Sequence, residues 1–211
     1  MPSAVTLAEL ARFAAGRGEA VEVAATFDHT GQKPFSYGTH AAHVAVDPRT
    51  GDVRIVDFVA VEDIGRVINP LVVHGQALGA IVQGLGGAFL EHLAYDAGGQ
   101  LLTATLADYL LPGAGDFPNI RGLCVETAPA PGNPLGAKGA GEGGIVAVAA
   151  AIGNAVSAAL SSLGVQAREL PLSPPRVFEL IARARAAAPS QDNSSSGQAD
   201  RGGARRQAHG G

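Results

Sequence analysis

Apolar residues recur at steps of three and four along several stretches of the chain, and this spacing predicts helices. We expect a short helix over Thr6 to Ala15, a long one over Pro70 to His92, and a last one that begins after Ser173, where two prolines follow. The apolar stripe of the last helix would consist of Val177, Leu180, Ile181 and Ala184.

Short extended patterns predict strands over Glu19 to Phe27, His40 to Val46, Val53 to Val61 and Ile120 to Thr127. The proline and glycine within Asp47 to Asp52 suit a tight hairpin loop, so the second and third of these strands should form an antiparallel pair. The predicted fold class is therefore α+β, with antiparallel strands and packed helices.

Residues 1–187 are expected to form one domain, because 46% of the chain is hydrophobic, which is near the globular average. Beyond them, serine, glycine, glutamine and arginine replace the apolar periodicity, so residues 188–211 are predicted to be a disordered tail. The segment Pro112 to Pro118 is interpreted as a surface turn, and the alternative is a loop whose Phe117 stacks on an aromatic substrate.

The formal net charge is −4 and the basic residues form no patch with aromatics, so a nucleic-acid partner is not expected. Polar side chains interrupt both long apolar stretches, so neither is predicted to span a membrane. No secretion signal is recognisable, which favours a cytoplasmic location. The single cysteine, Cys124, is interpreted as a buried strand residue, and His40 and His43 as strand or loop residues without a metal.

A glycine-rich run from Gly136 to Gly144 contains one carboxylate, Glu142, just before an alanine-rich helical pattern. Glycines remove side-chain bulk, so backbone and carboxylate can approach a ligand, and a helix start would keep the carboxylate ionised as a base. The alternative is a capping residue, since acidic residues are favoured in the first turn of any helix. The helix that follows would bury a face made of Ile145, Val148, Ala149, Ile152, Val156, Ala159, Leu160 and Leu163.

The same run fits two nucleotide-binding patterns only in part. Gly139 to Gly144 matches G-x-G-x-x-G, but prolines separate it from the preceding strand, whereas the dinucleotide pattern follows a strand directly. Lys138 is not followed by serine or threonine, as the phosphate loop requires. Neither pattern therefore indicates a nucleotide site.

A second glycine-rich stretch, Gly75 to Gly87, lies within the predicted long helix. Each glycine weakens a helix by about 0.5–1 kcal/mol relative to alanine, so this density indicates close approach of a ligand or another backbone. Gln83 is the main candidate for a ligand contact and Gln76 a second one; alternatively, Gln83 satisfies a backbone group in the interior. Before the helix, Asn69 is the expected N-cap, and Asp63 is expected to fix the turn.

Three motifs follow one another along the chain. Asp63 to Pro70 has the form acid-x-Gly-x-x-x-Asn-Pro, Gly75 to Gly86 the form Gly-Gln-x-x-Gly-x-x-x-Gln-Gly-x-Gly, and Lys138 to Glu142 the form Lys-Gly-x-Gly-Glu. Together they resemble the molybdenum hydroxylases of the xanthine dehydrogenase and aldehyde oxidase type, which carry these motifs in their large molybdopterin-binding subunit. The resemblance covers about Phe27 to Leu180.

The resemblance implies that Glu142 is the base that activates the hydroxyl of the molybdenum centre and that Gln83 is a polar contact to the pterin. A metal acidifies its bound water, so a nearby carboxylate can take the proton as the oxygen attacks an electron-poor carbon. The implied reaction is hydroxylation of an aldehyde or N-heterocycle, a small-molecule substrate, with oxygen from water. The other implied cofactor-binding residues, none of them a metal ligand, are Gln76, Gly84, Lys138, Gly139 and Gly141.

The resemblance also implies cofactors and partners. The cofactor would be molybdopterin, with the cytosine dinucleotide form left open. Iron–sulfur clusters and FAD would lie on partner chains, because such clusters are usually held by four cysteines and this chain has only Cys124. The family's large subunit is several times longer, so this chain resembles its C-terminal part and would act only with the upstream molybdopterin-binding portion. The alternative is a non-catalytic remnant or assembly module that binds no cofactor by itself.

Overall fold

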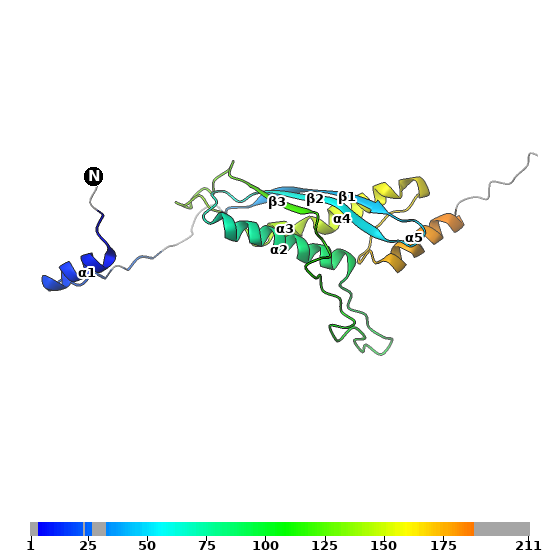
Figure 1. Ribbon diagram of the computed structural model, residues 1–211, viewed down its shortest axis with the longest axis horizontal. Coiled ribbons are helices and arrows are strands. Elements are labelled where there is room, and N and C mark those ends of the chain that lie inside the picture. Colours follow the sequence, from blue (N-terminus) through cyan, green and yellow to red (C-terminus); the bar gives the residue numbers. More distant parts are fainter. Residues whose placement is uncertain (1–3, 23, 27–32, 188–211) are drawn as a thin grey trace, which may run out of the picture.

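The computed structural model describes residues 4–22, 24–26 and 33–187 of the 211-residue chain. Figure 1 shows a small sheet covered by helices, with the first helix apart from this body. The elements of the described part are α1 (Leu7–Gly16), β1 (Tyr37–Val46), β2 (Val53–Asp63), α2 (Pro70–Phe89), β3 (Ile120–Val125), α3 (Gly143–Val146), α4 (Val148–Ala159), the 3₁₀ helix η1 (Ser161–Leu163) and α5 (Pro174–Ala187).

The predicted hairpin is confirmed: β1 and β2 pair antiparallel, with His40 opposite Ala60. Both strands extend beyond their predicted bounds, β1 back to Tyr37 and β2 forward to Asp63. Gly51 in the connecting loop has a φ of +78°, and a Cβ there would collide with the backbone of α5, so this turn requires glycine.

The third strand joins β2 in parallel, with Phe58 opposite Ile120 and Asp63 opposite Val125. The α+β class is confirmed, and the sheet is mixed, because only the β1–β2 pair is antiparallel. The parallel direction follows from α2 and the long segment after it, which return the chain to the same end of the sheet. β2 is therefore the central strand.

The strand predicted over Glu19 to Phe27 is wrong for the part that the structure describes, since residues 19–22 and 24–26 form no strand and are exposed. An alternating pattern is not enough without a neighbouring strand that accepts and donates the ladder hydrogen bonds. Val23, Phe27 and the predicted tail 188–211 lie outside the described residues. The first helix is confirmed, and Thr6 and Glu9 form a capping box at its start.

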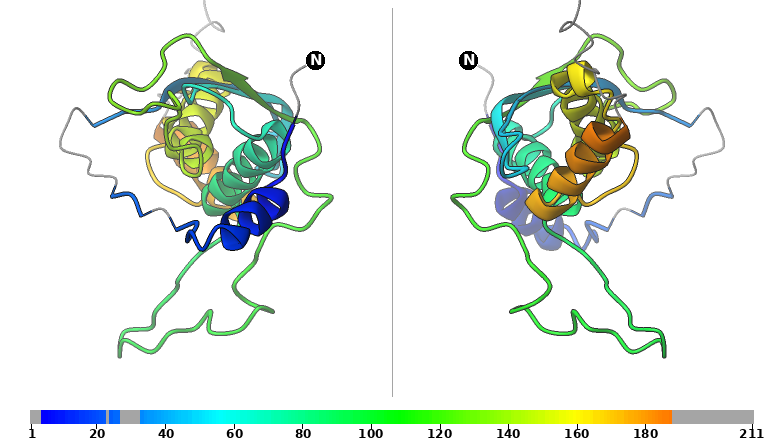
Figure 2. Two further views of the ribbon diagram at one scale, coloured as in Figure 1. Left: turned by 90° about the vertical axis from the view of Figure 1, so that its left-hand side faces the viewer. Right: turned by 90° about the vertical axis from the view of Figure 1, so that its right-hand side faces the viewer.

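Helices cover one face of the sheet, as the end-on views in Figure 2 show. α2 lies close to β3, because a Cβ added to Gly122 would be only 3.0 Å from the Cβ of Ala77. α5 is confirmed as the last helix, and Val177 and Ile181 on it are fully buried. The largest of the fully buried apolar side chains are Phe58, Ile81, Leu85, Ile152, Leu172 and Ile181.

By length and composition, α2 alone among the described helices would suffice to cross a membrane, and core helices of globular proteins often meet the same test. A third of its most apolar window, 33%, is buried against the rest of the chain. Its start is confirmed, because Asn69 Oδ1 accepts a hydrogen bond from the Val72 N–H at 3.3 Å and proline follows at the first helical position.

The single helix predicted over Ile145 to Leu163 is divided into α3, α4 and η1. The first break is at Ala147, whose φ of −100° and ψ of 0° leave the helical region. α3 packs on α2 while α4 packs on β1, so the two segments follow different partners. The predicted buried face nevertheless holds at Val148, Ile152 and Val156, which are fully buried.

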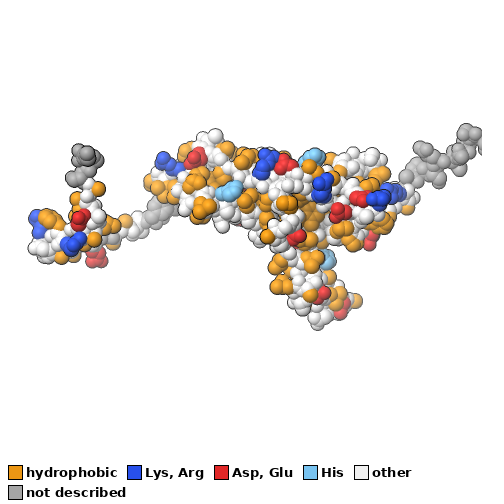
Figure 3. Space-filling model, viewed as in Figure 1, with side chains coloured by type: hydrophobic (Ala, Val, Ile, Leu, Met, Phe, Trp, Pro, Cys, Tyr) orange, Lys and Arg blue, Asp and Glu red, His pale blue; other side chains and the backbone are white. Residues whose placement is uncertain are grey.

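The segment between α2 and β3 projects from the body as an arm, which is visible in Figures 1 and 3. At its base, Phe117 packs against Phe89 with ring centroids 6.1 Å apart, next to the core. The predicted surface turn is confirmed at residues 113–116, which are exposed, whereas Phe117 packs inward and is not free to stack on a substrate. The exposed large apolar residues of the arm are Leu93, Tyr95, Leu102, Leu106, Leu110 and Leu111.

Candidate active site

Asp63, at the end of β2, is the centre of a buried hydrogen-bond network. Its side chain accepts hydrogen bonds from the N–H groups of Gly65 and Ala128, both at 2.9 Å, and from the Thr127 hydroxyl. The Thr127 hydroxyl, the Gly65 N–H and Lys138 hold the pKa of the Asp63 carboxyl far below its usual range. Asp63 therefore does more than fix the turn before α2, because it ties together segments far apart in the sequence.

Lys138 turns its ammonium inward onto this carboxylate. Nζ lies 3.1 Å from Asp63 Oδ1 and 4.5 Å from the ring centroid of Tyr37, and only 4% of the Lys138 side chain is exposed. The Lys138 backbone N–H also donates to the Ile64 carbonyl at 2.8 Å. The start of the glycine-rich run is thus fixed to the end of the central strand, and the Lys138 ammonium already has a partner within the chain.

The glycines of the run differ in their surroundings. A Cβ on Gly144 would lie 2.7 Å from the Ala77 carbonyl oxygen, so the loop backbone rests directly on α2. A Cβ on Gly141 would lie 3.5 Å from Gln76 Nε2, and one on Gly139 would meet nothing within 4 Å. Gly144 is therefore needed for packing inside the chain, whereas Gly139 leaves open space above the loop.

Glu142 occupies the N-cap position of α3, but its side chain makes no capping hydrogen bond within the described residues. α3 has only 4 residues, so it adds little dipole for the carboxylate. The Glu142 side chain is exposed and lines a cavity of about 210 Å³ together with Tyr37, Gly38, His40 and Glu62. The geometry favours a carboxylate available for chemistry over the capping interpretation.

Gln76 and Gln83 lie on one face of α2, about two turns apart, and both are exposed. Neither amide has a hydrogen-bond partner among the described residues, so Gln83 is not the interior packing amide of the alternative interpretation. Gly75 and Gly79 belong to the same exposed face, and a Cβ on either would meet nothing within 4 Å. Gly84 is different, because a Cβ there would lie 2.7 Å from the Val148 side chain.

Sequence reasoning missed two further polar residues beneath the loop. Glu62 is only 4% exposed and follows Phe58 and Ala60 on the core face of β2. Its Oε1, like Nδ1 of His40, is buried without a hydrogen-bond partner in the described part of the chain. Burial raises the pKa of Glu62 and lowers that of His40, although the Gly143 backbone partly opposes the latter shift. The sequence pattern of β2 contained a signal for this burial, because Glu62 continues the alternation of the core-facing residues Phe58 and Ala60.

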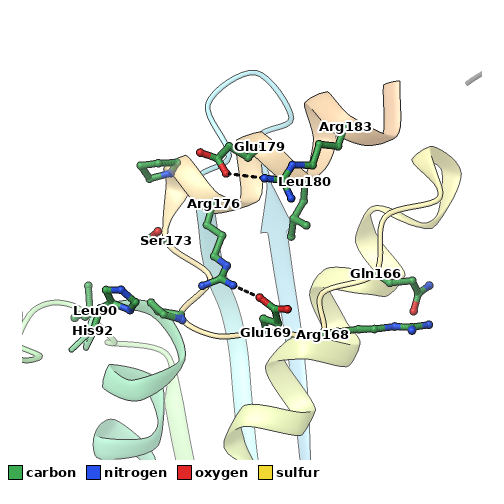
Figure 4. A pocket seen from close by; sticks show the side chains of 12 residues that line it. Leu90, His92, Gln166, Arg168, Glu169, Ser173, Arg176, Glu179, Leu180 and Arg183 are labelled. Carbon is green, nitrogen blue, oxygen red and sulfur yellow. Dashed lines mark hydrogen bonds and ion pairs between the residues drawn. The ribbon is translucent and has the colours of Figure 1, made fainter. Parts of the chain in front are cut away.

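A second cleft, about 650 Å³, shares no residue with the Glu142 cavity and lies between α5 and the segment before it (Figure 4). Two of its three guanidinium groups are engaged: Arg176 pairs with Glu169, and Arg183 lies 3.6 Å from Glu179, whereas Arg168 has no ion pair among the described residues. Exposed ion pairs of this kind contribute little to stability. Among the described residues, no three histidine, cysteine or acidic side chains are grouped to hold a metal ion.

Residues 2–118 match the molybdopterin cofactor-binding domain family. Over 144 residues the chain is 44% identical to the 6-hydroxypseudooxynicotine dehydrogenase complex subunit gamma of Paenarthrobacter nicotinovorans, covering 68% of this chain and 18% of that protein. It is 42% identical over 148 residues to the nicotine 6-hydroxylase large subunit of the same organism, covering 70% and 18%.

Among solved structures, the chain is similar to quinoline 2-oxidoreductase from Pseudomonas putida 86, with 46% identity and a TM-score of 0.66. This similarity covers 69% of the present chain and 18% of the other. The chain therefore spans about a fifth of the length of the relatives that it matches.

Proposed function

Because the chain belongs to the molybdopterin cofactor-binding domain family, in the molybdenum hydroxylases of the xanthine dehydrogenase and aldehyde oxidase type, we propose that it supplies the base of a hydroxylation reaction. The base is Glu142. One observation carries this proposal: the Glu142 carboxylate is exposed and makes no capping hydrogen bond, and the buried Asp63–Lys138 pair holds its loop in place.

The exposed face of α2 and the open side of the loop fit a bound molybdopterin. A glycine inside a helix costs about 0.5–1 kcal/mol, and nothing in the described chain lies near Gly75 or Gly79 to require it. Gln76 and Gln83 beside them each offer an amide donor and acceptor, which suits a pterin with both kinds of group. When bound, the cofactor supplies the oxidising centre that takes two electrons from the substrate carbon.

Each loop residue has its own part in holding this group. Gly139 and Gly141 leave room for close backbone approach, with Gln76 adjoining Gly141. Lys138 acts through Asp63, since its ammonium fixes the loop from below. Gly84 has no side chain, so the Val148 side chain packs directly on it, and the loop and the helix after it can lie close to α2. These roles divide the binding surface into contacts with the cofactor and contacts that shape it.

Glu142 contributes proton transfer. Hydroxylation with oxygen from water releases protons as well as electrons, so a carboxylate beside the reacting oxygen must take up a proton. Because the Glu142 carboxylate makes no hydrogen bond to its own helix, it can take up a proton without first breaking an interaction. General-base catalysis of this kind contributes about 10²–10⁴ in rate.

The proposed substrate is an aromatic N-heterocycle, because the three similar proteins with identities of 42% to 46% are named for nicotine, a nicotine derivative and quinoline, whereas those named for aldehydes or carbon monoxide are 28% to 35% identical. The chain covers only 15% to 20% of its relatives' lengths, so the upstream molybdopterin-binding portion would complete the site. Iron–sulfur and flavin subunits would receive the electrons in a cytoplasmic complex.

The test is co-expression of the chain with the upstream portion and the partner subunits. The isolated chain should contain no stoichiometric molybdenum, and the assembly should bind it. In the loaded assembly, Glu142→Gln should lower turnover by about 10²–10⁴ at unchanged metal content. Glu22→Gln is the matched control, since Glu22 is exposed and remote in the sequence from the loop. An assembly that never binds molybdenum, or full turnover of Glu142→Gln, would favour the remnant or assembly-module alternative.

A further inference from the structure

Glu62 lies in a slot that two glycines create. Gly38 is directly opposite Glu62 on β1, and a Cβ on Gly38 would lie 3.0 Å from Glu62 Cγ and 2.5 Å from the Val61 carbonyl oxygen. On the other side, a Cβ on Gly143 would collide with Glu62 Oε2. Any other residue at either position would displace the carboxyl, so the fold makes specific room for it.

The slot offers the carboxyl no counter-ion among the described residues. The titratable groups facing it are Tyr37 and His40 on β1, Cys124 opposite on β3, and Glu142 on the loop. α3 and the residue after it contribute only apolar side chains to the cavity. An unpaired charge in such a place is costly, so the neutral carboxyl is favoured.

Burial raises the pKa of Glu62 and lowers that of His40, and it raises the pKa of the Cys124 thiol, with the Glu62 charge as a second cause. All three groups are therefore pushed toward their neutral forms. The ring of His40 is itself held in an edge-to-face contact with Phe58, at 5.7 Å between centroids. His40 thus lines the cavity beside Glu62 and packs against the core residue Phe58.

Both polar residues meet the backbone of Gly143, the residue directly after Glu142. Glu62 Oε2 lies against Gly143, and the Gly143 backbone raises the pKa of His40, which burial lowers. Glu62 and His40, whose Oε1 and Nδ1 atoms are buried without a partner in the described chain, line the same cavity as Glu142.

We propose that Glu62 and His40 are positioning residues for the base: the neutral Glu62 carboxyl fills the slot beneath Gly143 and holds Glu142 toward its cavity, and ionisation of Glu62 weakens that hold. A negative charge in the slot demands water and opposes the nearby Glu142 carboxylate, so the loop moves away from β1 and β2. This inference rests on the proposed role of Glu142, but the link between Glu62 and Gly143 exists in the chain by itself.

The decisive measurement is a pH titration of backbone amide signals by nuclear magnetic resonance, on the complete 211-residue chain without cofactor. The Gly143 and Gly38 signals should share one step at a pH above the ordinary glutamate pKa of about 4.3. Glu62→Gln should remove this step, and Glu142→Gln should leave it. A wild-type Gly143 signal without such a step, or a step that persists in Glu62→Gln, would overturn the proposal.

In the loaded assembly, Glu62→Ala should lower turnover by up to about 100-fold at unchanged cofactor content, the effect of a base misplaced by about 1 Å. Glu62→Gln keeps the shape of the neutral carboxyl and should recover most of that loss. We expect wild-type turnover to fall at high pH as Glu62 ionises, and Glu62→Gln, which cannot ionise, should not show this fall. His40→Gln, a second variant for the case that Glu62→Ala misfolds, should lower turnover in the same way. The two hypotheses can be refuted separately. Normal turnover in Glu142→Gln contradicts the role of Glu142 as base, whereas only the titration decides whether Glu62 is coupled to Gly143.

Discussion

Replacing Gly79 by alanine should stabilise the isolated chain and hinder cofactor loading at the same time. Gly79 lies within α2 on its exposed face, and a Cβ there would meet nothing within 4 Å. Alanine is favoured over glycine inside a helix by about 0.5–1 kcal/mol, and no clash opposes this gain. Urea denaturation of the 211-residue chain, followed by circular dichroism, should show the full increase in the free energy of unfolding.

Gly144→Ala provides the contrast, because its Cβ would lie 2.7 Å from the Ala77 carbonyl oxygen and 2.9 Å from the Ala80 Cβ. Both distances are too short, so the loop or α2 must shift. Overpacking of this kind costs about 1–3 kcal/mol, which exceeds the gain from helix propensity. The same denaturation experiment should therefore give opposite signs for the two glycine-to-alanine substitutions.

In the assembly with the upstream portion, the added methyl group of Gly79→Ala occupies space that the proposed cofactor or its surrounding backbone needs. Molybdenum content per chain should fall although the chain itself is more stable. Two results would refute the reasoning: wild-type molybdenum content shows that nothing approaches this face of α2, and a loss of stability shows that the face is not open.

Three further outcomes follow. Gln83→Ala should leave the stability of the isolated chain unchanged, because the side chain is exposed, but should cost the loaded assembly about 1–3 kcal/mol in cofactor binding or turnover; equal metal content and rate would contradict it. Asn69→Ala should lower the free energy of unfolding by about 1 kcal/mol through loss of the α2 N-cap, measured by urea denaturation. Asp63 has a lowered pKa when folded, so its ionised form stabilises the chain above about pH 4 and this contribution fades as the pH falls further. The difference in unfolding free energy between wild type and Asp63→Asn should therefore shrink below pH 4, and a constant difference would contradict the network.

Local chemistry explains which parts of the fold were predictable. The β1–β2 hairpin, the capped start of α2 and the buried stripe of α5 each depend on neighbours in sequence, and all three are confirmed. The parallel pairing of β3 and the break at Ala147 depend on which distant element each segment packs against. The strand expected at Glu19 failed for the same reason, since a strand forms only with a partner.

The candidate site shows the same division. Glu142 and Gln83 could be found because motifs mark them, and the structure leaves both side chains exposed and without internal partners among the described residues. Their roles stay proposals. The ion pair of Lys138 with Asp63 spans 75 residues of sequence, and no local pattern indicates it. The alternation of β2 indicates that Glu62 faces the core, but the two glycines that make room for its carboxyl come from different segments, and no local pattern indicates them.

The position of Asp63 also has a consequence for the order of folding. Its bonds to Thr127 and Lys138 close loops of 64 and 75 residues, whereas the β1–β2 hairpin closes a short one. The hairpin can form early, but the hub at Asp63 requires long-range closure and belongs to the late contacts. A newly made chain should therefore pass through a stage with hairpin and helices in place and the Glu142 loop still loose.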